Sequence, residues 1–188
     1  MARFAALALV TPRLTLRRPT AADLPALYAI FSHLEVMRYW SSPPWTDLAQ
    51  AEHWLLDAQH DGDTGQALRL VLERRADQAV LGTCALHSLH AASRRAELGY
   101  ALGRPYWGAG YMHEALQALV TYAFETLDLH RLEADIDPRN QASAKALARL
   151  GFQLEGHLRE RWIVAGEISD TGWYGLLARE WPARTSGE

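Results

Sequence analysis

The sequence predicts a mixed, mostly antiparallel α/β fold in which helices cover both faces of a sheet of about seven strands. Strand-like segments are interleaved with segments of helical periodicity along the chain. Three strand-like segments in the middle follow one another through short polar connections, as in an antiparallel meander, and later strands alternate with helices. The 188 residues are 49% hydrophobic, enough for one domain with a large core. We expect a single domain over residues 1–188, with its core at about 12–181.

A strand and a helix are predicted first. Leu14 and Leu16 alternate with polar neighbours, as in a strand. Thr20 and Asp23 have the three-residue spacing of a capping box, in which two side chains satisfy backbone amides at the start of a helix. The helix that follows places its apolar side chains on one face: Leu24, Leu27, Tyr28 and Phe31.

A second helix is predicted after an irregular segment. Met37–Trp45 is rich in proline and aromatic residues and does not fit a regular helix. Thr46 is expected to cap the second helix, and Asp61-Gly62 to end it. Its inner face would carry Ala51, Trp54, Leu55 and Ala58.

The remaining elements complete the order β-α-α-β-β-β-α-β-α-β-β. Helical periodicity returns after Gly110 and continues to Leu127, and Asn140 caps a last helix that Gly151 ends. The single cysteine, Cys84, lies in a predicted strand and is expected to be a buried structural thiol. The predicted strands are residues 67–75, 79–89, 94–102, 130–136, 152–164 and 173–178.

Composition argues against several classes of protein. The net charge is −3 with both signs interspersed, which gives no support to nucleic-acid binding. No window approaches the run of about twenty apolar residues that a membrane-spanning helix needs, so no membrane partner is expected. Phe4–Val10 is too short for the apolar region of a targeting signal, and the single cysteine fits a reducing compartment, so we expect a cytoplasmic protein. The eight histidines lack metal-ligand spacing, and no metal site is expected.

The segment Tyr106–Ala115 carries the clearest chemical signal. It follows a predicted strand and opens a helix, so that successive backbone amides and the positive end of the helix converge, an arrangement that binds phosphate. Gly108 and Gly110 would let the backbone approach a ligand closely. A P-loop would need Gly-Lys-Ser/Thr, and a dinucleotide fingerprint would need a third glycine where His113 stands, so neither fits.

Three motifs resemble the RimJ/RimL branch of the GNAT acetyltransferases. They are WGAGYMHEAL at 107–116, DPRNQASAKALARLGFQLEG at 137–156 and WYGLLAREW at 173–181. The resemblance extends from LTLRRPTAADLPALY to the terminal Glu180-Trp181. It implies the fold of that superfamily, in which a mixed sheet is splayed between its fourth and fifth strands. The pantetheine arm of acetyl-CoA, the cosubstrate that the resemblance implies, lies in the splay.

The resemblance also implies which residues bind acetyl-CoA. Asn140 would bind the pantetheine arm, and Ser143 would lie near the sulfur. Pro105 stands where the broader superfamily often has Gln or Arg, and it has no N–H to donate. The splayed strand would pair its backbone with the pantetheine amides through Leu98–Leu102, which includes Leu98, Gly99 and Tyr100. Backbone amides that cradle the pyrophosphate would come from Trp107, Gly108, Ala109, Gly110, Tyr111 and Met112.

Acetyl transfer to an amine needs a base, an oxyanion site and a proton for the leaving thiolate. Glu97 is the candidate base, acting through a water, and the alternative is a surface glutamate paired with Arg94 or Arg95. A backbone N–H of the segment 98–100 would hold the oxyanion. Ser143 could protonate the thiolate, although serine in the first turn of a helix is commonly only a capping group.

The glutamate that some family members carry in the strand after Leu154-Glu155-Gly156 is absent. By spacing from Ser143 its place is taken by Trp162, and Glu160, two residues earlier, shares the same face by strand alternation. Trp40 and Trp45 are candidates for walls of an amine channel, because aromatic faces attract cations.

The acceptor is left open among three hypotheses. The branch's namesakes favour the α-amine of a protein N-terminus, as in ribosomal proteins. A small amine such as an amino acid, a polyamine or an aminoglycoside is the alternative, and a deep acidic pocket would favour it. A non-catalytic acyl-CoA-binding module would bind the coenzyme without turnover. The resemblance also allows a homodimer.

Overall fold

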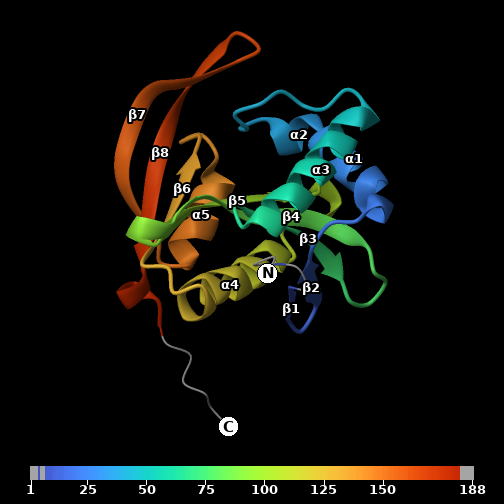
Figure 1. The fold of residues 1–188 in the computed structure, drawn as a ribbon. Coiled ribbons are helices and arrows are strands. Elements are labelled where there is room, and N and C mark those ends of the chain that lie inside the picture. The colour runs from blue at the N-terminus through green and yellow to red at the C-terminus, as the bar shows by residue number, and fades with distance from the viewer. Residues whose placement is uncertain (1–3, 5–6, 183–188) are drawn as a thin grey trace.

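The computed structural model describes residue 4 and residues 7–182, which form a mixed sheet of eight strands with helices on both faces (Figure 1). The strand order is β1-β2-β3-β4-β5-β6-β8-β7, and among the strands of the described residues only β5 and β6 pair in parallel. The predicted fold class is confirmed, with eight strands where about seven were expected. The strands are β1 Ala8–Val10, β2 Leu14–Arg17, β3 Leu68–Arg74, β4 Val80–His90, β5 Arg95–Leu102, β6 Arg131–Ile136, β7 Gln153–Val164 and β8 Glu167–Leu177.

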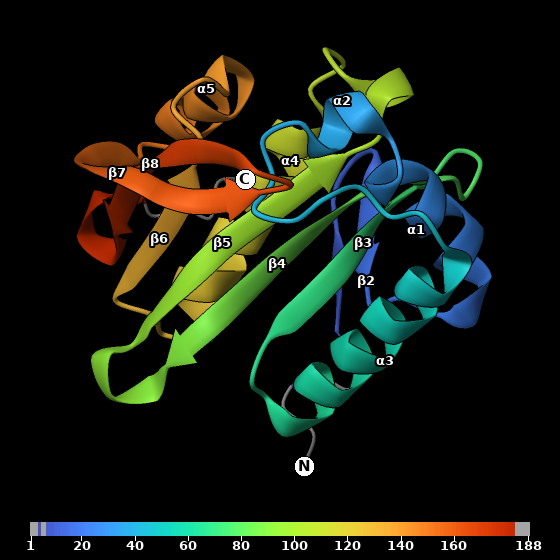
Figure 2. The same cartoon turned by 90° about the horizontal axis from the view of Figure 1, so that it is seen from above.

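Two apolar clusters hold the helices against opposite faces of the sheet (Figure 2). Val71 and Ala101 pack with the first three helices, whereas Leu70 and Leu98 pack with the later ones. Cys84 is buried, as predicted, in the cluster that contains Leu70 and Leu98, and burial raises the pKa of its thiol to about 12. The helices are α1 Leu24–Phe31, α2 Leu34–Met37, α3 Leu48–Thr64, α4 Tyr111–Thr121 and α5 Gln141–Arg149.

The boundaries of α3 differ from the prediction at both ends. Asp47, rather than Thr46, is the N-cap, since its side chain accepts a hydrogen bond from the Ala49 N–H at 2.9 Å. The helix continues past Asp61-Gly62 and ends at Gly65, whose φ of 77° is the left-handed conformation that glycine tolerates best. The first glycine in the sequence was therefore not the residue that ends this helix.

Three other elements were predicted incompletely. Ala8–Val10, treated only as part of an apolar stretch, pairs with β2 as strand β1. The helix predicted to reach Leu127 is α-helical only to Thr121 and continues as a π-helical turn. Strand β8 begins at Glu167 rather than at residue 173, because a polar segment without apolar alternation pairs with β7 in a long hairpin.

The predicted capping box between Thr20 and Asp23 is present and lies within a buried ion pair. The Asp23 carboxylate accepts a hydrogen bond from the Thr20 N–H at 2.7 Å and two from the Arg17 guanidinium, both at 2.8 Å. Burial would raise the pKa of Asp23, but the hydrogen bonds from Arg17 and Thr20 lower it, and the net pKa lies below its usual value. The pair therefore ties strand β2 to the start of α1.

Asp23→Asn is expected to lower the free energy of unfolding by about 2–3 kcal/mol at pH 7, because it removes the charge of a buried carboxylate that accepts two hydrogen bonds from Arg17 and leaves Glu73 as the remaining charge partner of that guanidinium. Since the folded-state pKa of Asp23 is depressed, this stabilisation is complete above the unfolded pKa of about 4 and is lost as the pH falls through the folded value. Urea unfolding of the wild type and of Asp23→Asn, at pH 7 and below pH 4, measures this difference in stability. Asp63→Asn, at a largely exposed partner of Arg18, is the control, and an Asp23→Asn midpoint equal to that of the control would contradict the account.

Candidate functional site

The site lies where β5 and β6 separate. The two strands pair only from Arg95 and Arg131 to Glu97 and Glu133. Beyond these residues β5 continues to Leu102 and β6 to Ile136, with no further pairing between them in the part of the chain that the structure describes. A cavity of about 400 Å³ opens at this divergence, lined from β4, β5, β6, the start of α5, the β7–β8 hairpin and the loop after α2.

A pair of hydroxyl groups lies on the wall that α5 forms. The side chains of Tyr100 and Ser143 share a hydrogen bond of 2.6 Å, and burial raises the pKa of Tyr100 to about 12, so its phenol is neutral at physiological pH. Asn140 caps α5 by accepting a hydrogen bond from the Ser143 N–H at 3.1 Å. The Ser143 hydroxyl therefore bonds Tyr100 at the cavity wall, and the side chain that caps α5 is that of Asn140.

Glu97 lines the opposite half of the cavity, on the sheet face that α1–α3 cover. The alternative considered for it, a pairing with Arg94 or Arg95, is not present, since Arg94 binds Asp128 and Arg95 binds Glu133. The Nδ1 atom of His87 lies 4.0 Å from the Glu97 carboxylate. The carboxylate is therefore placed to accept a hydrogen bond from an amine or a water in the cavity.

The glycine-bearing loop presents backbone donors at the start of α4. Gly108 and Gly110 have φ of 77° and 79°, and Gly110 is the N-cap. Among the described residues, the backbone N–H groups of 108–113 have no hydrogen-bond acceptor. The guanidinium of Arg13 donates to the Ala109 carbonyl at 2.9 Å and binds Glu114, which fixes the loop from the side of β2. These donors suit a phosphate group.

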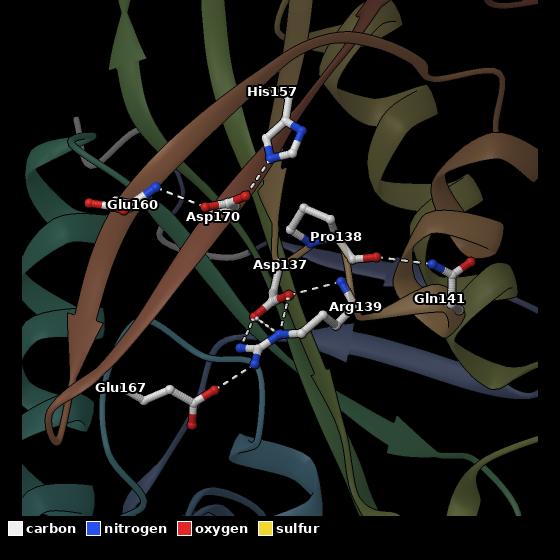
Figure 3. Close-up of polar contacts among 8 residues, drawn as sticks. All are labelled: Asp137, Pro138, Arg139, Gln141, His157, Glu160, Glu167 and Asp170. Atoms are coloured by element: carbon white, nitrogen blue, oxygen red, sulfur yellow. Dashed lines mark hydrogen bonds and ion pairs between the residues drawn. The ribbon is translucent and has the colours of Figure 1, made fainter.

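The other predicted site residues are distributed differently. Trp40 lines the cavity, whereas Trp45 packs against Phe31 with ring centroids 4.6 Å apart. Glu160 is exposed in a bulge of β7, with φ of 53°, and its N–H donates to Asp170 at 2.8 Å (Figure 3). The register of the hairpin shifts between residues 158 and 162, so the alternation assumed for Glu160 does not hold, and Trp162 lines the cavity.

Several residues of the cavity wall were not predicted from the sequence. Asp135, His87 and Trp173 line the cavity. The signal for Asp135 was present in the alternation of Leu-Glu-Ala-Asp-Ile at 132–136, which places residues 133 and 135 on one face of β6. His87 and Trp173 come from strands that only the pairing of the sheet brings to this point.

An arginine connects the tip of the β7–β8 hairpin to the end of β6. Arg139 donates to Asp137 and, at 2.6 Å, to Glu167 (Figure 3). Burial would raise the pKa of Asp137, but the hydrogen bonds from Arg139 lower it, and the net pKa lies below its usual value. Asp137 lines the cavity as a carboxylate whose charge is already compensated.

Comparison with known proteins identifies the family. The Acetyltransferase (GNAT) domain matches residues 13–153, and the chain belongs to this family of N-acetyltransferases. It is 38% identical over 173 residues to the N-acetyltransferase p20 of Bacillus licheniformis, covering 92% of this chain and 97% of that protein. It is 37% identical over 84 residues to the [Ribosomal protein uS5]-alanine N-acetyltransferase of Escherichia coli, covering 45% and 43% of the two chains.

The fold is also shared with solved structures. Spermidine N-acetyltransferase from Vibrio cholerae, in complex with CoA and spermine, superposes with a TM-score of 0.81 at 23% identity, covering 90% of this chain and 98% of that chain. This likeness shows the fold. Within the described residues there is no helix long and apolar enough to cross a membrane and no group of three or more potential metal ligands.

Proposed function

We propose that this acetyltransferase moves the acetyl group of acetyl-CoA onto the α-amine of a protein N-terminus. The observation that carries the proposal is the cavity at the β5–β6 divergence. It has the hydroxyls of Tyr100 and Ser143 on one wall and, on the other, the carboxylate of Glu97, which pairs with neither Arg94 nor Arg95. The thioester and the amine can meet between these walls.

The residues present fit acetyl-CoA. The donors of 108–113 would bind its pyrophosphate, as expected for Gly108, Ala109, Gly110, Tyr111 and Met112, whereas the Trp107 N–H donates to the Arg104 carbonyl at 3.4 Å. In the segment of Leu98, Gly99 and Tyr100, the backbone groups that point toward β6 form no strand pairing within the described chain and are available to the pantetheine amides. Asn140 lies at the same wall.

Direct attack accounts for the roles of the remaining groups. Glu97 accepts a proton from the amine, through a water, as the amine nitrogen bonds to the thioester carbon. A backbone N–H in the segment 98–100 stabilises the oxyanion. When the carbon–sulfur bond breaks, Ser143 supplies a proton to the thiolate and is reprotonated from solvent.

A second groove supports a peptide acceptor. It has a volume of about 240 Å³, lies between the loop after α2 and the tip of the hairpin, and shares Tyr39, Trp40, Asp137 and Ser169 with the first cavity. Its remaining wall includes Met37, Pro43 and Val164, which suit the first residues of a chain that extends away from the reacting amine. The uS5-alanine acetyltransferase among the relatives supports the same acceptor class.

A small polyamine is the second candidate acceptor. The carboxylates of Glu97 and Asp135 in the cavity favour a cationic substrate, and the spermidine acetyltransferase shares the fold. A non-catalytic acyl-CoA-binding module is the candidate of another class, and it predicts coenzyme binding with no turnover.

Release of thiol from acetyl-CoA, measured with a chromogenic reagent, distinguishes these candidates. The panel contains peptides with free or blocked N-termini, polyamines, amino acids and aminoglycosides. Turnover confined to peptides with free N-termini supports the proposal. Turnover confined to polyamines would replace it with the second candidate, and coenzyme binding without turnover on any amine would favour the binding module.

Tyr100→Phe is expected to lower kcat about tenfold, because the Ser143 hydroxyl loses the partner that orients it. The KM for acetyl-CoA should change little, since the backbone contacts of β5 remain. Ser143→Ala should lower kcat at least as far, and the double variant should be no worse than Ser143→Ala if the two hydroxyls act as a unit. Additive losses in the double variant would contradict the coupling, and Tyr122→Phe serves as a control outside the cavity.

A further inference from the structure

The carboxylate of Asp135 lines the cavity without a protein partner. Asp135 is the fifth residue of β6 and lies opposite Trp173 of β8. Across the described residues, its side chain forms neither a hydrogen bond nor an ion pair. Its neighbours on the strand differ in this respect, because Glu133 binds Arg95 and Arg131. The proposed base, Glu97, is therefore accompanied in the cavity by a second carboxylate, and this one has no side-chain partner among the described residues.

Asp135 and Glu97 lie on the same face of the sheet. Glu97 is paired in register with Glu133 across the parallel β5–β6 ladder, and residues 133 and 135 alternate onto one face of β6. This face is the one that carries Ala101 and packs against α1–α3, opposite the wall of Ser143. Both carboxylates consequently lie in the half of the cavity that the acceptor would enter.

The other charged groups of the wall do not neutralise this half. Asp137 is compensated by Arg139. His87 lies beside Glu97, at 4.0 Å, and Arg161 lies over the Trp162 ring with its guanidinium carbon 5.7 Å from the ring centroid. Neither of these two side chains forms an ion pair or a hydrogen bond with Asp135.

Aromatic residues line the same cavity as these carboxylates. They are Trp40, Trp162 and Trp173, of which Trp173 lies opposite Asp135 in the pairing of β6 with β8. The faces of aromatic rings attract cations, and a carboxylate in a cavity binds an ammonium or guanidinium group better than one in open water. The wall thus combines carboxylates and aromatic rings, and both recognise positive charge. An uncharged group placed beside Asp135 would gain from neither.

We propose that Asp135 selects acceptors that carry a second positive charge beside the amine that reacts. This inference rests on the proposed function and specifies, in addition, the charge that the acceptor carries. Glu97 and Asp135 lie on neighbouring strands and are offset by two residues along them, so the second charge would lie roughly 7 Å or more from the reacting nitrogen. A diamine such as 1,4-diaminobutane and a peptide with a basic residue next to its N-terminus both supply this arrangement.

The test compares matched acceptors in the wild-type enzyme and in Asp135→Asn, which keeps the shape of the side chain and removes its charge. One pair is butylamine and 1,4-diaminobutane, and the other is a peptide with norleucine or lysine at its second position. The readout is the ratio of kcat/KM for the dication to that for the monocation. Asp128→Asn, an exposed carboxylate outside the cavity, is the control.

The wild-type enzyme and Asp128→Asn should prefer the dication about tenfold in at least one pair, and Asp135→Asn should bring that ratio close to one. The pair that responds identifies the source of the second charge. Equal rates for both members of each pair in the wild type, or an unchanged preference in Asp135→Asn, would overturn the proposal.

Binding gives an answer that does not depend on the proposed function. Calorimetry of 1,4-diaminobutane and butylamine with the coenzyme A-bound enzyme measures the same preference without chemistry. A dication preference that Asp135→Asn removes supports the charge site even if no panel member is acetylated. Equal affinities of the wild-type enzyme and Asp135→Asn for 1,4-diaminobutane would reject the charge site, even if acetyl transfer to peptides is rapid.

Discussion

Gly110→Glu is expected to weaken acetyl-CoA binding at least about a hundredfold while the protein remains folded. Gly110 is the N-cap of α4, and the donors on either side of it have no protein acceptor among the described residues. A Cβ at this position would meet only the guanidinium of Arg13, at 3.5 Å, so the substitution is not blocked by packing. The added carboxylate would instead occupy the place proposed for the pyrophosphate and repel it.

Two variants separate charge from backbone strain. Gly110 has φ of 79°, so any side chain there is strained, and Gly110→Ala measures that cost without the charge. Gly166, in the β7–β8 turn, has a similar φ of 86° and open space around it, so Gly166→Glu introduces the same residue away from the loop. Calorimetry with acetyl-CoA and thermal melting should show lost affinity for Gly110→Glu alone. An unchanged affinity of Gly110→Glu for acetyl-CoA would show that this loop does not bind the pyrophosphate.

Glu97→Gln is expected to lower kcat by about 10²–10³-fold at pH 7, the range of a lost general base. The KM for acetyl-CoA should change little, because Glu97 lies on the acceptor side of the cavity and not along the proposed coenzyme path. Without the base, the rate should depend on the fraction of acceptor that is already neutral. It should therefore rise with pH until the α-amine, with a pKa near 8, is deprotonated.

The pH–rate profile distinguishes catalysis from a structural role. Glu125→Gln, an exposed glutamate in the π-helical turn, should keep the wild-type profile. If Glu97 only bound the amine, Glu97→Gln would raise the acceptor KM and leave kcat intact. A Glu97→Gln enzyme with wild-type kcat at pH 7 would show that another group removes the proton.

Local chemistry explains what could be predicted from the sequence. The Asn140 cap and the Thr20–Asp23 capping box could be predicted because each depends on residues that are close in the chain. Glu97 could be proposed as the base because it immediately precedes Leu98–Leu102, the segment that the family resemblance identifies as the splayed strand. Its freedom from Arg94 and Arg95 could not, because the partners of those arginines, Asp128 and Glu133, are distant in sequence.

The predictions that failed depend on tertiary pairing. Glu160 was placed by simple alternation, and the bulge in β7 that changes its direction arises only from pairing with β8. Trp45 lies in an irregular segment whose position is set by packing on Phe31 of α1, which no local pattern reports. The alternation of apolar and acidic residues at 132–136 indicates which face of β6 carries Asp135. The lack of a side-chain partner for Asp135 depends on the neighbouring strands and cannot be seen in the sequence.

Mass spectrometry of a peptide incubated with the enzyme and acetyl-CoA tests the central claim most directly. The peptide carries a free N-terminus and an internal lysine, and its matched control has a blocked N-terminus. Addition of one acetyl group to the α-amine of the free peptide, with the blocked peptide unchanged, is the predicted result. Acetylation of the lysine in both peptides, or of neither peptide while polyamines are acetylated, would contradict transfer to a protein N-terminus.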